Sequence, residues 1–442
     1  MRSLLQLRRQ AGSGDCAQTR CLVAWVGARK APAKALRSTK DEGLAAADER
    51  LVRHAQHPTL QLIARRKANC LDQPGRRGDP YKLGLVVEGG GMRGVISGAM
   101  LMGLRALGLH NTFDAVYGAS AGAINATYFL TNQPHGLDIY AEDLVDGRFL
   151  DPSAMFFPSA LRALVSSSPS RPAMDLAFLL GHVMRSVKPL DLAAVINSPV
   201  PLKPLDLAAV INCPVPLKIV ASSLDALRPI ILSDFTSETD LLECLAASAT
   251  IPEVVGPPRL VRGHRCVDAA VFEPVPVASA LRDGCTHVLV LCTRTAAKVT
   301  GTNAPMYHAA TAAVEHAVRN TFLHGGYMED AWRCAHSNRG CLDDDALYDA
   351  FHGCFTQSHL NFGGHVLPLH PASQRGVHPV CTDPRKLNAA RVEGYHTIER
   401  LVGRPLGLTF QAGSCAEAYM TRHAKGVEQL GAESGGDGGV WS

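Results

Sequence analysis

The chain has 442 residues, of which 46% are apolar and 19% charged. This is the composition of a globular protein, and it excludes a collagen-like, coiled-coil or wholly disordered chain. The length predicts two to three domains, or one large α/β domain with extensions. No stretch of 18 residues is continuously apolar, so the sequence predicts no membrane-spanning helix.

The net charge of +4 is unevenly distributed along the chain. Residues 1–40 carry nine Lys and Arg and a single acid, whereas residues 41–442 carry 35 bases and 39 acids. The slightly acidic body argues against a nucleic-acid partner. The basic leader has the composition of a mitochondrial or plastid transit peptide; without import, we expect a cytoplasmic protein.

The 13 cysteines are odd in number and form no CxxC pair. They are expected to be reduced thiols packed as small hydrophobic groups. Because the clustered spacing of a zinc site is absent, the sequence predicts no metal. It also predicts no other cofactor.

Strand and helix patterns alternate along the chain. Strands are predicted at Leu83–Glu88, Phe113–Gly118, Leu217–Leu224, Arg228–Phe235, Thr286–Cys292 and, as an edge strand, Gly363–Leu369. Helices are predicted at Gly94–Leu107, Ala119–Leu130, Thr239–Thr250, Val275–Leu281, Tyr307–Leu323, Asp343–Phe355 and Pro384–Leu401. This alternation predicts a mostly parallel sheet with helices on both faces.

Composition divides the chain into five parts. They are the leader (1–40), a helical segment and linker (41–80), a core domain (81–295), a mainly helical C-terminal extension (296–430) and a glycine-rich disordered tail (431–442). Within the core domain, residues 188–217 are a tandem duplication in which 14 of 15 positions match. Two copies are too few for a solenoid, so we expect one copy to dock and the other to loop out at the surface.

A G-x-S-x-G pattern lies between a predicted strand and a predicted helix. It reads GASAG and spans Gly118–Gly122, with Ser120 at its centre. A serine on such a sharp strand-to-helix turn has its hydroxyl held clear of the sheet, and small neighbours leave room for the backbone to double back. Ser120 is therefore a candidate nucleophile.

A second glycine-rich turn, Gly89–Gly94, follows the first predicted strand. Its backbone N–H groups can hold an anion at a helix start. One reading is a dinucleotide site, but the acid expected at the end of the second strand is missing, and Asp114 stands at its start instead. The other reading is an oxyanion hole for acyl transfer.

A carboxylate beside a serine can act as its general base without a histidine, and Asp268 follows the predicted helix Thr239–Thr250. A Ser-His-acid triad stays open as an alternative. His264 and His287 lie nearest to Asp268 in the sequence, but neither belongs to a motif. The dipeptide Asp283–Gly284 follows a helix, so we give it no role.

Together, Tyr81–Leu130 and Leu241–Arg294 resemble the patatin-like phospholipase family, with a likeness to its bacterial-type members. The resemblance rests on EGGGMRG at Glu88–Gly94, GASAG at Gly118–Gly122 and VDAAVFEPVPV at Val267–Val277. It implies a three-layer α/β/α fold with a mostly parallel central sheet and a helical C-terminal extension, in which residues 81–295 form the catalytic domain. It also implies hydrolysis of lipid esters without a metal.

Carried over to this chain, the resemblance makes Ser120 the nucleophile and Asp268 the base of a dyad. The oxyanion hole would be formed by Gly89, Gly90, Gly91, Met92, Arg93 and Gly94. The elbow glycines are Gly118 and Gly122, and Arg93 either steadies the loop or meets an anionic head group. The expected partner is a lipid or ester substrate, with contact to a membrane surface; the apolar stretch Met174–Met184 either lies on a bilayer or packs in the core.

One position departs from the family pattern, which has glycine after the aspartate where this chain has Ala269. If that position needs a positive φ, alanine costs on the order of 1 kcal/mol and rotates the carboxylate. The alternative function is therefore a catalytically impaired protein that still binds lipid.

Overall fold

The computed structural model describes residues 54–69, 77–131, 133, 136, 139–151, 172–187, 215–251, 254–295, 365–414 and 416–420. The basic leader, the first copy of the repeat and all but the last three residues of the second copy lie outside these residues. So do the helices predicted at Tyr307–Leu323 and Asp343–Phe355, and the glycine-rich tail.

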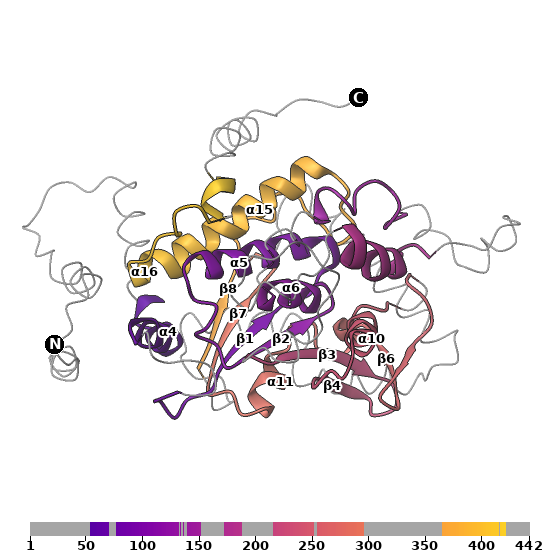
Figure 1. Cartoon of the computed structure of the whole chain (residues 1–442), viewed down its shortest axis with the longest axis horizontal. Coiled ribbons are helices and arrows are strands. Elements are labelled where there is room, and N and C mark those ends of the chain that lie inside the picture. The colour runs from indigo at the N-terminus through magenta and orange to yellow at the C-terminus, as the bar shows by residue number, and fades with distance from the viewer. Residues whose placement is uncertain are drawn as a thin grey trace, which may run out of the picture.

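An eight-stranded sheet forms the centre of the fold (Figure 1). Its strands are β1 (Leu83–Val87), β2 (Ala115–Ala119), β3 (Leu217–Ser223), β4 (Arg228–Leu232), β5 (Arg259–Val261), β6 (His264–Val267), β7 (His287–Leu291) and β8 (His365–Leu369). Their order is β5-β6-β3-β2-β1-β7-β8, and β4 also pairs with β3. The run β3-β2-β1-β7-β8 is parallel, whereas β4, β5 and β6 pair antiparallel. The predicted mostly parallel sheet is confirmed.

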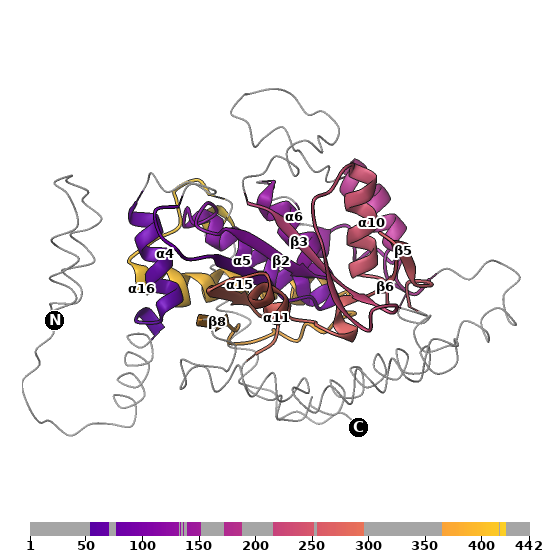
Figure 2. The same cartoon turned by 90° about the horizontal axis from the view of Figure 1, so that it is seen from below.

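Helices cover both faces of the sheet. The α-helices are α4 (Pro58–Ala68), α5 (Gly94–Ala106), α6 (Ala121–Leu130), α10 (Glu238–Ser248), α11 (Val277–Arg282), α15 (Pro384–Ile398) and α16 (Arg404–Leu406). The described residues also form the 3₁₀ helices η1 (Gly91–Arg93) and η5 (Ala269–Val271). They further form the π-helices η3 (Phe178–Val187) and η7 (Glu399–Gly403). Helices α4 and α10 lie at opposite ends of the sheet (Figure 2).

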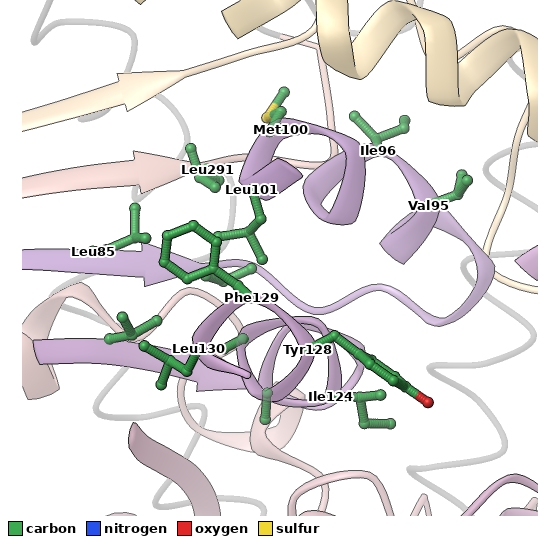
Figure 3. Packing of buried hydrophobic residues seen from close by; sticks show 14 of the residues in the cluster. Leu85, Val95, Ile96, Met100, Leu101, Ile124, Tyr128, Phe129, Leu130 and Leu291 are labelled. Atoms are coloured by element: carbon green, nitrogen blue, oxygen red, sulfur yellow. The ribbon is translucent and has the colours of Figure 1, made fainter. Parts of the chain in front are cut away.

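Side chains of the parallel strands alternate between two apolar clusters. In β1, Leu85 and Val87 join the large cluster formed with α5, α6 and α10, whereas Val86 joins a smaller one formed with α11. Figure 3 shows Leu85 and Leu291 directed toward the α5 and α6 side chains of the large cluster. Helices therefore bury both faces of the sheet, as the three-layer fold requires.

The C-terminal residues pack onto the same core. Strand β8 is the edge strand beside β7, as predicted, and α15 lies along α5 (Figure 1). The two helices approach closely because Gly394 of α15 faces the backbone of α5. A Cβ on Gly394 would lie only 2.6 Å from the Ile96 carbonyl oxygen. The C-terminal helix α15 thus helps to hold the helix that begins at Gly94.

The apolar stretch Met174–Met184 packs mainly into the core: Leu179, Val183 and Met184 are buried there. Within the described residues, five cysteines are buried free thiols: Cys244, Cys266, Cys285, Cys292 and Cys381. Within the described ranges, no helix is both long enough and apolar enough to cross a membrane.

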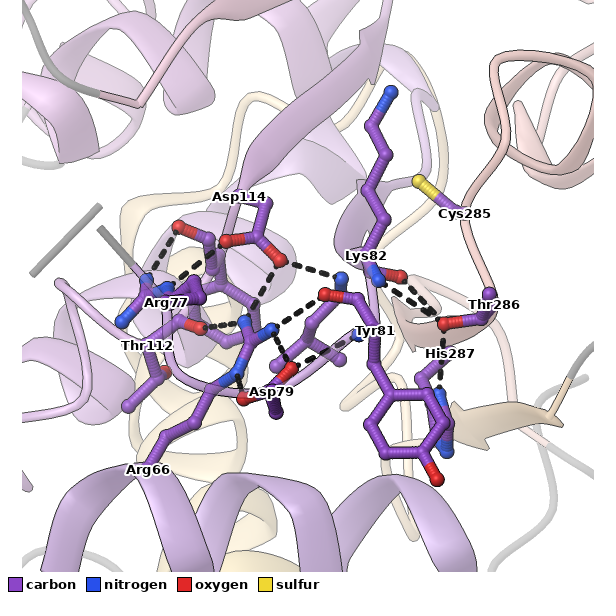
Figure 4. A network of polar contacts seen from close by, with 12 residues as sticks. Arg66, Arg77, Asp79, Tyr81, Lys82, Thr112, Asp114, Cys285, Thr286 and His287 are labelled. Atoms are coloured by element: carbon purple, nitrogen blue, oxygen red, sulfur yellow. Dashed lines mark hydrogen bonds and ion pairs between the residues drawn. The ribbon is translucent and has the colours of Figure 1, made fainter. Parts of the chain in front are cut away.

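A buried arginine joins α4 to the amino-terminal end of the sheet (Figure 4). Arg66 donates to both carboxylate oxygens of Asp79, at 2.9 and 2.8 Å, and to Asp114 at 2.8 Å. Asp114 also accepts the backbone N–H of Leu83 at 2.7 Å. Asp114 therefore has a structural role. It does not serve as the ribose-binding acid that a dinucleotide site would need.

We expect Arg66→Ala to lower the free energy of unfolding by about 3 kcal/mol, because the partly buried Asp79 loses its arginine partner and Asp114 keeps only Arg77. Urea unfolding of the variant measures this loss. Arg65→Ala, on the exposed face of the same helix, is the matched control and should change stability by no more than about 0.5 kcal/mol. Equal losses in both variants would contradict this account of the network.

Candidate active site

The glycine-rich turn and the serine elbow leave adjacent parallel strands at the same edge of the sheet. The register pairs Val87 at the end of β1 with Gly118 in β2. A Cβ added to Gly89 would lie 2.7 Å from the Ala119 carbonyl oxygen and 3.1 Å from Cβ of Ser120. The two predicted motifs are therefore in direct contact, at the carboxyl edge where α/β sheets place their ligands.

Ser120 lies in a strained backbone conformation, with φ 51° and ψ −124°. Such a geometry costs on the order of 1–3 kcal/mol and persists only where the surroundings enforce it. The two elbow glycines permit it: a Cβ on Gly118 would lie 2.4 Å from Cα of Ala123, and one on Gly122 would lie 2.4 Å from the Val87 oxygen. Ser120 itself is partly exposed at the start of α6.

The N–H groups of the glycine-rich turn are not equivalent. Met92 donates to the Pro379 carbonyl at 2.9 Å, Arg93 to Gly90 at 3.2 Å, and Gly89 to Pro274 at 3.5 Å. The Gly94 N–H is used within the turn that starts α5. Among the described residues, the N–H groups of Gly90 and Gly91 have no acceptor. Both glycines are partly exposed and have positive φ values, 139° and 58°.

Glu88 and Arg93 hold this turn in place. The Glu88 carboxylate accepts the backbone N–H of Thr293 and lies 3.2 Å from Nε of Arg294, beyond the end of β7. Arg93 is 6% exposed, and its guanidinium folds against Gly90. Of the two roles predicted for Arg93, this placement fits the one that steadies the loop.

Asp268 follows β6 and caps η5. Its Oδ1 accepts the N–H of Ala270 at 2.8 Å, and its Oδ2 is buried without a well-formed hydrogen bond to any described residue. Burial raises the pKa of Asp268 from 3.8 to about 6, while the Ala270 N–H and the nearby Ser120 hydroxyl partly oppose that rise. The Ser120 hydroxyl is therefore close enough to Asp268 to favour its charged form.

Ala269 does not adopt a positive φ, since it opens the short helix η5. Its side chain is fully buried against Ala119 and Val220. The backbone strain expected for alanine at this position is therefore absent, because the chain turns into a 3₁₀ helix after the aspartate.

We expect Ala269→Gly to leave kcat unchanged within about threefold and to lower stability by roughly 0.5–1 kcal/mol, since glycine adds backbone entropy and removes a packed methyl group. Ester turnover and thermal unfolding measure the two effects. A rise in kcat of tenfold or more would show that Ala269 impairs the site.

The two histidines nearest to Asp268 in sequence do not join it. His264 begins β6, four residues earlier, and bonds the Ser223 hydroxyl at 3.0 Å. At about 3.3 Å per strand residue, it lies about 13 Å from Asp268. His287 pairs with Leu83 at the amino-terminal end of β1, opposite the glycine turn.

Two contacts at the site were not predicted from the sequence. The Ser248 hydroxyl accepts the backbone N–H of Ser120 at 2.8 Å, and the Pro379 carbonyl takes the N–H of Met92. The first has a weak sequence signal, because Ser248 lies in Ala246–Pro252, whose pattern also resembles the family's helix-plus-Pro approach to the aspartate. The second has none, because it depends on a carbonyl from a distant segment.

The structure is thus a mostly parallel α/β/α fold in which a strained serine lies beside a glycine-rich turn. Residues 85–281 match the family model for patatin-like phospholipases, so the chain contains a patatin-like phospholipase domain. This domain match supports lipid acyl hydrolysis as the general activity.

Two solved structures are similar over most of the chain. VipD from Legionella pneumophila is 15% identical with a TM-score of 0.38, covering 74% of this chain and 67% of its own. Human GIVD cytosolic phospholipase A2, in complex with a fluorophosphonate inhibitor, is 14% identical with a TM-score of 0.32, covering 87% and 64%. A search of curated proteins finds no match.

Proposed function

We propose that the protein hydrolyses ester bonds of lipids through an acyl-enzyme formed on Ser120, with Asp268 as the general base. The observation that carries this proposal is the strained, partly exposed Ser120 beside a buried carboxylate oxygen and two N–H groups without acceptors. Nucleophile, base and anion-binding donors converge at one point of the sheet edge.

In the first half-reaction, Ser120 Oγ attacks the ester carbonyl carbon and Asp268 Oδ2 accepts the hydroxyl proton. The N–H groups of Gly90 and Gly91 donate to the oxyanion of the tetrahedral intermediate. The C–O bond to the alcohol then breaks, and Asp268 returns the proton to the leaving alkoxide. The products are a free alcohol and an acylated Ser120.

In the second half-reaction, Asp268 takes a proton from water as the water oxygen attacks the acyl carbonyl. The same two N–H groups hold the second oxyanion, and the proton passes to Ser120 as the fatty acid leaves. A general base works best when its pKa is near the operating pH. The pKa of Asp268, about 6, keeps this carboxylate ionised and basic near neutrality.

Release of fatty acid from phospholipid–detergent micelles and from a soluble p-nitrophenyl ester tests this proposal. We expect turnover of both substrates by the wild-type protein. Binding of the micelles without release of fatty acid, and without cleavage of the soluble ester, would instead support the lipid-binding alternative.

A further inference from the structure

The carboxyl-terminal end of α10 contacts the backbone on both sides of the proposed dyad. Ser248, its last residue, is fully buried. Its hydroxyl accepts the Ser120 N–H at 2.8 Å and donates to the Val220 carbonyl of β3 at 2.5 Å. One hydroxyl therefore links the elbow, helix α10 and the strand beside the elbow.

Two residues further along, the same segment holds the aspartate. The Thr250 carbonyl accepts the backbone N–H of Asp268 at 2.8 Å. Thr250 is itself fixed, because its hydroxyl donates to the Ala246 carbonyl at 2.6 Å and accepts from Arg259 at 3.1 Å. Ser120 and Asp268 are 148 residues apart in the sequence, yet both are bonded to one three-residue segment.

We propose that the segment Ser248–Thr250 sets the distance between Ser120 and Asp268, and that Ser248 is a positioning residue for the reaction. This inference rests on the proposed function. Ser248 does not reach the substrate; it acts by holding the strained backbone of Ser120 so that the hydroxyl faces Asp268.

The Ser120 N–H bonds to Ser248 and not to a group within helix α6. Within α6, the Ser120 carbonyl already accepts from Ala123 at 2.9 Å and Ile124 at 3.3 Å. The Ser120 N–H points the other way, out of the helix, and Ser248 is its acceptor. Without that acceptor, the backbone at φ 51° loses a contact that stabilises it, and relaxation turns the hydroxyl away from Asp268.

The test compares Ser248→Ala with Ser248→Thr in steady-state kinetics on the soluble ester. We expect Ser248→Ala to lower kcat by about 10- to 100-fold with KM nearly unchanged, since misplacement of a reacting group by about 1 Å has effects of this size. Ser248→Thr keeps the hydroxyl and should keep kcat near wild type, even though its extra methyl lowers the Tm. The matched control, Thr397→Val, removes a buried hydroxyl–carbonyl bond in α15 and should leave kcat unchanged.

The pH profile gives a second readout that a purely structural role would not move. The Ser120 hydroxyl helps to stabilise the charged form of Asp268. If Ser120 retreats in Ser248→Ala, the midpoint of kcat/KM against pH should shift upward from about 6.

An inactive wild-type protein would overturn the proposed function. An active wild type whose Ser248→Ala variant retains its kcat and pH midpoint would overturn the positioning role alone. Loss of kcat in proportion to Tm across the Ala, Thr and Thr397→Val variants would also overturn it, because that pattern reports general destabilisation.

Discussion

Replacing Ser120 with alanine is expected to lower kcat for ester hydrolysis by about 10⁴- to 10⁶-fold, the loss that follows removal of a serine nucleophile. No other described hydroxyl combines a strained elbow, a neighbouring buried carboxylate and the glycine-rich turn. Fatty-acid release by the purified variant measures the loss. The residual rate should equal the uncatalysed rate plus what the oxyanion donors contribute alone.

The fold should survive this change, because alanine fits the same backbone with one atom fewer. We expect the Tm of Ser120→Ala to stay within a few degrees of wild type. Ser233→Ala, which alters a surface serine beyond β4, is the matched control and should retain full activity. Retention of activity in Ser120→Ala would mean that the nucleophile lies elsewhere.

The second large effect is expected for Asp268→Asn, which removes the base but keeps the side-chain shape. We predict a loss in kcat of about 10³- to 10⁴-fold, comparable to removal of the acidic member of other serine hydrolase sites. Asp283→Asn is the control, because Asp283 precedes a glycine, as the family's aspartate does, but its carboxylate bonds Tyr117 and Lys82. It should keep activity within about threefold.

The same substitution should stabilise the protein at alkaline pH. The pKa of Asp268 is raised from 3.8 in the unfolded chain to about 6 in the fold. The fold therefore disfavours the charged carboxylate, and stability falls as pH rises from about 4 through 6. This rise of about two pKa units corresponds to a loss of roughly 3 kcal/mol in the free energy of unfolding.

Thermal unfolding of wild type and Asp268→Asn at pH 4 and pH 8 compares the protein with Asp268 protonated and with Asp268 charged. We expect similar Tm values at pH 4, where Asp268 is largely protonated, and a higher Tm for the variant at pH 8. Wild-type kcat/KM should fall as the pH drops below about 6, because the base becomes protonated. A variant less stable than wild type at pH 8 would contradict the burial of an ionised Asp268.

The features predictable from the sequence are those encoded by neighbouring residues. The strand before Glu88 and the elbow around Ser120 follow from short apolar runs that end in glycine. Helix α10 begins at Glu238, one residue before the predicted start at Thr239, and Ser237 caps it. Local chemistry determines each of these, so one sequence is enough.

The remaining features depend on contacts between distant segments. The β5–β6 hairpin was not predicted, because strands of three and four residues that are partly exposed carry no clear alternation. The conformation of Ala269 depends on η5, and the Met92 N–H is used by Pro379, almost 290 residues away. The pairing of Ser248 with the Ser120 backbone is equally remote in sequence.

Fluorophosphonate labelling followed by peptide mass spectrometry tests the central claim most directly, because the probe reacts only with an activated serine. The account predicts one labelled peptide in the wild-type protein, modified at Ser120, no labelling of Ser120→Ala, and labelling of Asp268→Asn slowed at least about 100-fold. A folded wild-type protein that stays unlabelled, or that is labelled at another serine, would contradict the proposed acyl-enzyme on Ser120.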